Sequence, residues 1–272
     1  MTLKEAERLL SEAGIEDARH EARIIFAAVG GEPIYKLLTP DYSCDKKEVE
    51  EAVSRRAARE PLAYVIGCVD FFNERYKVTP DCLIPRPDTE ILVEFAVDHI
   101  PEGKRFIDLC TGSGCVAIST LCNTKNTTAI AADLSEAALA VARENAGFMG
   151  VEDRIEFLSL DVTKEPIHEK VFAVLSNPPY VSESAYRTLE PEIFREPKMA
   201  FLGGEDGGDF YRILTPLYRN VIEDDGFIAY EIGYDQADML RSIAEDNNMR
   251  VSILRDLSGN SRVAVLRKNN TP

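Results

Sequence analysis

The chain has 272 residues, of which 45% are hydrophobic, 47 are acidic and 31 are basic, so that its net charge is −16. This length is sufficient for one large α/β domain and a smaller one. The negative charge disfavours binding to duplex nucleic acid, which requires many phosphates to be neutralised. It is compatible with a protein substrate and, more simply, with solubility. The sequence contains no apolar run that approaches the length of a transmembrane helix, and its charged start is unlike a signal peptide.

The 6 cysteines are irregularly spaced along the sequence. They form no Cys-x-x-Cys pair and have no accompanying histidine cluster, so neither a disulfide framework nor a metal site is expected. Reduced thiols are typical of the cytoplasm, where we expect this protein to be located. We expect it to be monomeric, and to bind neither a membrane nor, directly, nucleic acid.

Helices are predicted at the start of the chain. Apolar residues recur at helical spacing over residues 3–13 and 18–29, and residues 46–59 form a third, more highly charged helical stretch. Residues 62–84 differ in character, because a glycine and scattered aromatic residues are typical of a β-hairpin. We interpret this hairpin as the connection between two domains.

Strands and helices alternate in the rest of the chain, which predicts a doubly wound, mostly parallel sheet. The predicted strands are residues 105–109, 128–133, 155–160, 171–175, 227–231, 251–254 and 262–267. The predicted helices are one that opens at Cys115 and others over residues 135–149, 211–223 and 235–246. Ser135 is a suitable N-cap. The predicted domains are therefore a helical N-terminal domain with its hairpin linker, residues 1–80, and a second domain, residues 81–272.

A rigid turn with the sequence SNPPY, residues 176–180, follows one of the predicted buried strands. Pro178 and Pro179 lack backbone N–H groups and have fixed φ angles, so the strand ends there. The Asn177 side-chain oxygen, the Pro178 carbonyl and the Tyr180 ring then suit a planar –NH2 group, which needs two acceptors and a surface for stacking. The alternative interpretation is an ordinary proline-rich turn.

A glycine-rich turn, CTGSG at residues 110–114, connects the first strand of the sheet to a helix. This arrangement brings the backbone close to a nucleotide-like ligand, although the spacing is not that of a dinucleotide-binding fingerprint. The next strand ends in Asp133, whose carboxylate can accept both hydroxyls of a ribose. The third strand ends at Asp161 and Val162. Together these features predict a site for an adenosine-containing ligand at the carboxyl ends of parallel strands.

As a set, these motifs resemble a known family. Asp-x-x-Thr-Gly-Ser-Gly, a strand-end acid and Asn-Pro-Pro-Tyr are similar to a class I S-adenosylmethionine-dependent methyltransferase that modifies a planar amino or amide nitrogen. Residues 60–67 (EPLAYVIG) and 83–90 (LIPRPDTE) resemble the glutamine methyltransferases of peptide chain release factors, the PrmC/HemK family. Residues 194–197 (FREP) and 202–207 (LGGEDG) fit the same family. The resemblance extends from about residue 18 to residue 266.

The resemblance implies a Rossmann-like α/β fold with a mostly parallel, seven-stranded sheet whose last strand is antiparallel, and a small helical N-terminal domain. It implies methyl transfer from S-adenosylmethionine, with S-adenosylhomocysteine as the product, to the glutamine amide of the Gly-Gly-Gln motif in class I release factors. The N-terminal helices would bind the release factor away from the modified loop. The cofactor-binding residues are then expected to be Cys110, Thr111, Gly112, Ser113, Gly114, Asp133, Asp161, Val162 and Asn177. The expected catalytic residues are Asn177, Pro178 and Tyr180, with Pro179 joining them in substrate binding.

Two positions depart from the family pattern. Cys110 occupies a position that is commonly glycine in this family, so the turn must tolerate a side chain there. Val162 stands where some relatives have an aromatic residue that can stack on adenine, and it offers apolar contact only. Either difference weakens cofactor binding if nothing compensates for it.

Other interpretations remain open at this stage. A ribosomal-protein glutamine methyltransferase uses the same chemistry, and a DNA adenine methyltransferase shares Asn-Pro-Pro-Tyr but should have a basic recognition region, which this chain lacks. A non-catalytic binding module would have lost the acceptor turn or the cofactor acid, and both are intact. In the segment PRPD, Arg86 and Asp88 either connect the two domains or belong to the substrate site.

Overall fold

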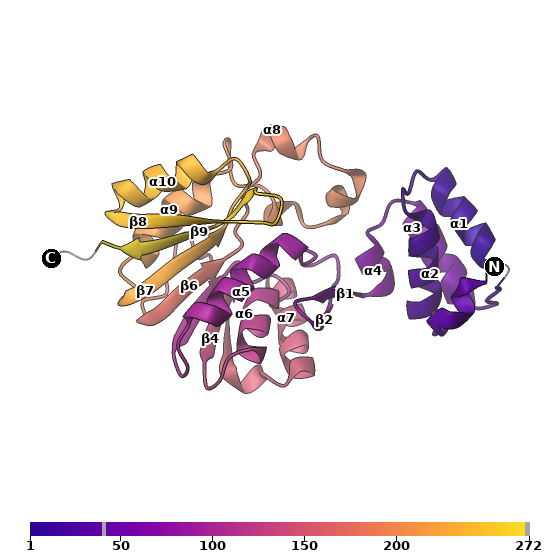
Figure 1. Ribbon diagram of the computed structural model, residues 1–272, viewed down its shortest axis with the longest axis horizontal. Coiled ribbons are helices and arrows are strands. Elements are labelled where there is room, and N and C mark those ends of the chain that lie inside the picture. Colours follow the sequence, from indigo (N-terminus) through magenta and orange to yellow (C-terminus); the bar gives the residue numbers. More distant parts are fainter. Residues whose placement is uncertain (40–41, 270–272) are drawn as a thin grey trace. The chain divides into compact units, whose positions relative to one another are not determined.

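The computed structural model describes residues 1–39 and 42–269 (Figure 1). The chain folds into two compact units. The first comprises Met1–Cys68 and a short later segment, Glu190–Arg195; the second comprises Val69–Leu189 and the chain from Glu196 onward. Within the described ranges, no helix combines the length and the apolar character required to cross a membrane.

Helices form the first unit, and the three longest of them were predicted from the apolar periodicity. The helices of this unit are α1 (Leu3–Glu12), α2 (Ala18–Ala28), η1 (Ile34–Leu38), α3 (Lys47–Ala57) and α4 (Leu62–Ile66). At the start of α1, the Thr2 hydroxyl accepts a hydrogen bond from Glu5 N while the Glu5 carboxylate accepts one from Thr2 N, which is a capping box. The apolar faces of the helices pack around a common core that includes Leu10, Phe26 and Val53.

The segment Glu190–Arg195 is far in sequence from the rest of the first unit. It contains the 3-10 helix η4 (Pro191–Arg195). The Glu192 carboxylate accepts hydrogen bonds from Arg56 at 2.9 Å and from Arg59 at 2.8 Å. Burial raises the pKa of Glu192, but the two guanidinium groups more than offset this and leave the pKa below its usual value. This segment is therefore bound to the first unit by charge-assisted hydrogen bonds.

A seven-stranded sheet forms the centre of the second unit, in the order β5-β4-β3-β6-β7-β9-β8. The strands are β3 (Arg105–Leu109), β4 (Thr128–Asp133), β5 (Ile155–Ser159), β6 (Val171–Ser176), β7 (Ile222–Glu231), β8 (Met249–Arg255) and β9 (Ser261–Lys268). Neighbours among the first five strands of this order are parallel, whereas β9 is antiparallel to both β7 and β8. The predicted Rossmann-like α/β class is confirmed, including the antiparallel last strand.

Helices cover both faces of this sheet (Figure 1). The helical elements of the second unit are η2 (Pro87–Thr89), α5 (Glu90–His99), α6 (Cys115–Cys122), α7 (Glu136–Met149), η3 (Glu152–Arg154), α8 (Glu183–Tyr186), η5 (Lys198–Ala200), α9 (Asp209–Tyr218) and α10 (Ala237–Asp246). Successive strand residues point to opposite faces. Accordingly, Phe106 of β3 packs in one core with Leu92 of α5, and Ile107 packs in another with Leu214 of α9. The sheet is therefore buried on both sides, as parallel sheets generally are.

The hairpin of β1 (Cys68–Phe71) and β2 (Glu74–Lys77) packs within the second unit. Phe71 and Tyr76 are buried in its core, and the Tyr76 hydroxyl is hydrogen-bonded to Ser119 Oγ at 2.6 Å. The division seen in the structure thus differs from a boundary at residue 80, because the aromatic side chains of the hairpin are buried against α6 rather than among the N-terminal helices.

Two predicted element boundaries are wrong. Residues 62–66 form helix α4 rather than the first arm of a hairpin, and the helix ends at Gly67, which has a φ of 80°. The helix predicted over residues 211–223 ends at Tyr218, because Ile222 already pairs with Val171 as the first residue of β7. Both errors arise where a short apolar run fits a helix and a strand equally well.

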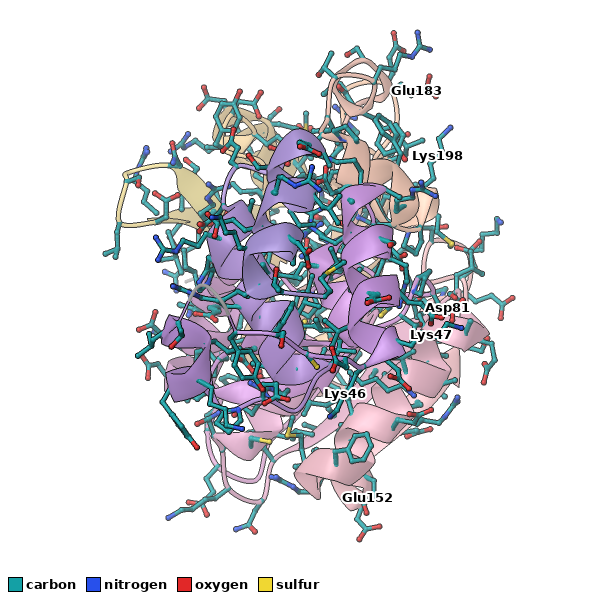
Figure 2. The ribbon with its side chains drawn as sticks, turned by 90° about the vertical axis from the view of Figure 1, so that its right-hand side faces the viewer. Lys46, Lys47, Asp81, Glu152, Glu183 and Lys198 are labelled. Atoms are coloured by element: carbon teal, nitrogen blue, oxygen red, sulfur yellow. The ribbon has the colours of Figure 1, made fainter. Side chains whose placement is uncertain are left out.

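Charged side chains of both signs project from the surface (Figure 2). Lys46 and Lys47 lie at the start of α3, and both are exposed. Among the acidic residues, Glu152 and Glu183 lie in the first turns of η3 and α8.

Candidate active site

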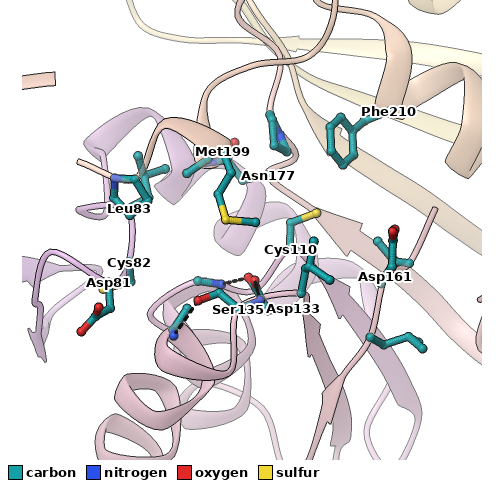
Figure 3. Close-up of a pocket in the computed structure, with 18 of the residues that line it drawn as sticks. Asp81, Cys82, Leu83, Cys110, Asp133, Ser135, Asp161, Asn177, Met199 and Phe210 are labelled. Atoms are coloured by element: carbon teal, nitrogen blue, oxygen red, sulfur yellow. Dashed lines mark hydrogen bonds between the residues drawn. The ribbon is translucent and has the colours of Figure 1, made fainter. Parts of the chain in front are cut away.

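A cavity of about 250 Å³ lies at the carboxyl ends of β3, β4, β5 and β6 (Figure 3). Such a position, where the strand order reverses, is the usual ligand site of an open α/β sheet. The predicted site residues that line it are Cys110, Gly112, Asp133, Asp161, Val162, Asn177 and Pro179. The predicted residues Thr111, Ser113, Gly114, Pro178 and Tyr180 lie behind this lining or beside it, and are not part of the cavity wall.

The turn after β3 owes its shape to residues with positive φ angles. Gly114 has a φ of 84°, and a Cβ there would lie 2.7 Å from Ile118 Cδ1 and 3.1 Å from Ala142 Cβ. Gly112, with a φ of 55°, has no described atom within 4 Å of the position that a Cβ would occupy. Gly114 is therefore required for packing of the helix, whereas Gly112 leaves the backbone accessible from the cavity.

Asp108, the first residue of the Asp-x-x-Thr-Gly-Ser-Gly segment, stabilises this turn by hydrogen bonds. Its Oδ2 accepts hydrogen bonds from Thr111 Oγ1 at 2.6 Å and from Ala117 N at 3.2 Å. Oδ1 is buried and has no hydrogen-bond partner among the described residues. Burial raises the pKa of this carboxyl to about 7. Thr111 thus shapes the turn through Asp108.

The titration of Asp108 should make stability depend on pH. Its pKa in the folded protein, about 7, is above the ordinary value of 3.8, so the native state retains the proton longer than the unfolded chain does. Stability from this group therefore falls as the pH rises from about 4 to about 7. Relative to the wild type, Asp108→Asn should gain up to about 1.4 kcal/mol of unfolding free energy per pH unit in this window.

Urea unfolding at several pH values measures this difference in the pH dependence of stability. Asp153→Asn, at an exposed position, is the control; parallel curves for wild type and Asp108→Asn would contradict the prediction.

Asp133 is the last residue of β4, and its side chain connects the turn after β3 with the turn after β4. Its Oδ2 accepts a hydrogen bond from Gly112 N and its Oδ1 accepts one from Ser135 N, both at 2.9 Å (Figure 3). Burial raises the pKa of this carboxyl, and the backbone donors partly offset the effect. Each carboxylate oxygen can accept a further hydrogen bond, so the side chain can still receive two donors from a ligand.

Asp161 and Val162 follow β5 and form another wall. The Asp161 carboxylate accepts hydrogen bonds from Lys164 Nζ at 2.7 Å and from Thr163 Oγ1 at 2.5 Å. These partners, Lys164 foremost, hold the pKa of Asp161 below its usual value. The Val162 side chain, which is 5% exposed, packs in the core and also lines the cavity. This wall therefore combines a fixed anionic group with an apolar surface.

Residues 176–180, which we call the acceptor turn, contribute Asn177 and Pro179 to the lining of the cavity. Ser176 Oγ donates to the Leu109 carbonyl at 2.7 Å and so joins the ends of β6 and β3. The Asn177 amide nitrogen Nδ2 donates to Thr89 Oγ1 at 3.2 Å. The Tyr180 hydroxyl donates to Glu231 Oε1 at 3.1 Å. Because the Asn177 –NH2 group is bound to Thr89, its oxygen is the atom left to accept a hydrogen bond from a ligand.

Comparisons with known proteins identify the family. The PrmC N-terminal domain family matches residues 2–67, and the methyltransferase small domain family matches residues 87–208. The release factor glutamine methyltransferase of Caulobacter vibrioides is 34% identical over 268 residues, covering 96% of this chain and 93% of that protein. The chain belongs to the release factor glutamine methyltransferase family.

Two further similarities place this glutamine methyltransferase among its relatives. The bifunctional methyltransferase of Rickettsia felis is 33% identical over 300 residues, and the match spans 56% of the length of that protein. The crystal structure of the ribosomal protein L11 methylase from Lactobacillus delbrueckii subsp. bulgaricus superposes with a TM-score of 0.51 at 17% identity, covering 68% of this chain and 81% of that one. The latter likeness shows the shared methyltransferase fold.

Several residues of the glutamine methyltransferase cavity were missed by sequence reasoning. Cys82, Leu83, Met199 and Phe210 line the cavity, and Met199 extends into it (Figure 3). They lie in segments outside the strand ends; Leu83 begins the LIPRPDTE segment, whereas no local motif distinguishes the other three. The glycine pairs at residues 203–204 and 207–208 were the nearest signal for Phe210, since they precede α9, which carries this residue.

Arg86 and Asp88 have a role other than connecting the two domains. Arg86 forms an ion pair with the buried Glu196, which also accepts a hydrogen bond from Ile84 N at 3.0 Å. Asp88 lies 3.0 Å from Arg262. All of these residues belong to the second unit. The PRPD segment is thus fixed within the methyltransferase unit, immediately before Thr89.

The left-handed backbone of Cys110, with a φ of 60°, is costly for a residue with a side chain. We expect Cys110→Gly to be more stable than Cys110→Ala by about 1 kcal/mol. Both variants remove the thiol, so their difference isolates the backbone effect. Urea unfolding of the two proteins side by side measures it, and equal midpoints would show that this turn carries no such strain.

Proposed function

We propose that this enzyme transfers a methyl group from S-adenosylmethionine to the side-chain amide nitrogen of the glutamine in the Gly-Gly-Gln motif of class I peptide chain release factors. The names of its relatives support the substrate class. The observation that carries the proposal is the Asn177 amide, whose –NH2 group is bound to Thr89 at the wall of the cavity. A site built in this way presents an acceptor oxygen to an incoming amide.

The cavity residues fit the cofactor. Gly112 leaves its backbone open to the cavity, and the half-buried Asp133 carboxylate keeps free lone pairs beside it. We assign the backbone contacts of the cofactor to residues 110–114, its ribose hydroxyls to Asp133, and its adenine to Asp161 and Val162. An apolar wall with a few fixed polar groups is the typical composition of such a site.

The chemistry requires an unreactive nitrogen to be aligned. S-adenosylmethionine, when bound, supplies a methyl group that its sulfonium has already activated. The glutamine amide is a poor nucleophile, because its lone pair is delocalised into its carbonyl. Asn177 Oδ1 and the Pro178 carbonyl would accept its two hydrogens and point the nitrogen toward the methyl group, while the Tyr180 ring packs on the amide plane. Alignment of this kind is worth about 7–11 kcal/mol of an activation barrier.

A dedicated catalytic base is unnecessary in this scheme. The two acceptors hold both amide protons before transfer, and one proton can leave after the carbon–nitrogen bond has formed. What the acceptor turn must provide is rigidity, which the two prolines and the contacts of Asn177 and Tyr180 supply.

Mass spectrometry of a purified class I release factor, incubated with the enzyme and S-adenosylmethionine, tests the proposal. We expect one added methyl group, mapped to the Gly-Gly-Gln glutamine, and none without enzyme. Ribosomal proteins and DNA serve as competing substrates in the same experiment. A methyl group on either of these, with none on the release factor, would overturn the proposed substrate and leave the cofactor assignment standing.

A further inference from the structure

A buried carboxyl at the end of β7 contacts the acceptor turn from behind. Glu231, the last residue of β7, is 2% exposed. Its Oε1 accepts a hydrogen bond from the Tyr180 hydroxyl at 3.1 Å, and its Oε2 has no hydrogen-bond partner among the described residues. A buried carboxyl is costly, and apolar residues of the same size often serve stability as well or better. Packing alone therefore does not account for an acid here.

A second connection reaches the acceptor turn through Thr89. The Thr89 hydroxyl accepts the hydrogen bond from Asn177 Nδ2 at 3.2 Å. The same hydroxyl lies close enough to Glu231 to lower the pKa of its carboxyl. Thr89 is 1% exposed and follows the fixed PRPD segment. Glu231 thus neighbours both residues that orient the turn, Thr89 on one side and Tyr180 on the other.

The backbone of Tyr180 is held by the loop that follows Glu231. Gln236 Nε2 donates to the Tyr180 carbonyl at 2.9 Å, and Gln236 Oε1 accepts from Gly233 N at 2.8 Å. The Tyr211 hydroxyl lies 2.9 Å from the Glu231 carbonyl, to which it donates. The side chain and the backbone of Tyr180 are therefore both bound by the same short stretch, residues 231–236.

We propose that Glu231 is a positioning residue for methyl transfer, which acts through the Tyr180 hydroxyl and Thr89 to hold the acceptor turn in its reactive geometry. The inference rests on the proposed function of that turn. It assigns Glu231 no contact with the substrate or the cofactor. Its charge state should matter, because an ionised acceptor forms stronger hydrogen bonds than a neutral one.

Asp88, Arg262 and Tyr180 are the charged and titratable groups that affect the Glu231 carboxyl. Burial raises the pKa of this carboxyl to about 7, with Asp88 raising it further and Thr89, Tyr180 and Arg262 lowering it. Arg262 is itself paired with Asp88 at 3.0 Å and with Asp256 at 2.8 Å. The ionised fraction of Glu231 therefore increases as the pH rises through neutrality.

Steady-state kinetics on the release factor test the proposal with three variants. Glu231→Gln should lower kcat by between about tenfold and about a hundredfold, the range expected for a misplaced acceptor, with the dissociation constant of S-adenosylmethionine within about twofold of wild type. Tyr180→Phe, which retains the ring, should lower kcat similarly. The double variant should be no worse than the worse single one, because both remove the same contact. Glu223→Gln, on the same strand but paired with Lys104, is the control and should leave kcat unchanged.

The pH profile separates positioning from a merely structural role. Wild-type kcat should fall as the pH drops below about 7, and Glu231→Gln should lack this limb. Three results would each overturn the inference. These are an unchanged kcat in Glu231→Gln, independent and multiplicative losses of kcat in the double variant, or identical pH profiles for the wild type and Glu231→Gln. If Glu231→Gln does not fold, Tyr180→Phe decides, since an undiminished kcat there would refute a role that acts through this hydroxyl. A wild-type enzyme that fails to methylate the release factor refutes the proposed function instead.

Discussion

Asn177→Ala is expected to reduce turnover by at least about a hundredfold, the loss typical for removal of one group that orients and polarises the reacting atoms. The alanine also loses the hydrogen bond of Asn177 to Thr89, but the prolines and the Ser176–Leu109 hydrogen bond still fix the path of the acceptor turn. It removes the oxygen that would accept one hydrogen of the substrate amide. The dissociation constant of the cofactor should stay within about tenfold of wild type, since a loss of transition-state contacts lowers kcat selectively.

Single-turnover methylation of the release factor measures this effect, and equilibrium binding of S-adenosylhomocysteine measures the cofactor site independently. Asn123→Ala is the matched control, because Asn123 is exposed at the end of α6 and lies outside the cavity lining. Wild-type rates in Asn177→Ala would refute the acceptor mechanism. A rate loss accompanied by an equal loss of cofactor affinity would instead assign Asn177 to the cofactor.

Asp133→Ala is expected to weaken cofactor binding by about a hundredfold or more, because hydrogen bonds to a charged group contribute about 1.5–3 kcal/mol each. The variant loses the acceptor for two ribose hydroxyls. It also leaves Gly112 N and Ser135 N without their present partner, so the glycine-rich turn loses its fixed position. Asp133→Asn retains one acceptor oxygen and should show an intermediate loss.

Isothermal titration with S-adenosylhomocysteine measures these affinities without any requirement for activity. Asp153→Ala, an exposed acid on η3, should bind normally. Equal affinity in Asp133→Ala and the wild type would remove Asp133 from the cofactor site. Equal losses for alanine and asparagine would indicate that the charge matters and the remaining oxygen does not.

Much of the fold was predictable from local patterns. Strands β3 and β4 begin and end at the predicted residues, because each is a continuous apolar run bounded by polar or glycine-rich turns. Ser135 is the N-cap of α7, as predicted, with its hydroxyl accepting a hydrogen bond from Ala138 N. Helix α4 and the start of β7 were missed, since their short apolar runs are decided by tertiary pairing rather than by sequence periodicity.

The predictable part of the site consists of residues that follow parallel strands. Cys110, Asp133 and Asn177 meet at one cavity because the carboxyl ends of parallel strands lie at the same edge of a sheet. Thr89 lies outside any strand, and Glu231, although it ends the predicted strand 227–231, was not singled out. Their importance depends on hydrogen bonds to residues 88 and 51 positions away, respectively, and single-sequence patterns carry no information on contacts of this range.

The return of Glu190–Arg195 to the first unit has a consequence for how these enzymes can be recombined. A chimera that takes Met1–Cys68 from another enzyme would keep Glu192 of this one and replace Arg56 and Arg59. Unless the donor also supplies basic side chains at those positions, the hybrid contains a half-buried acid without a counter-charge. Exchanges of the first unit should therefore include both of its chain segments, Met1–Cys68 and Glu190–Arg195, rather than the first alone.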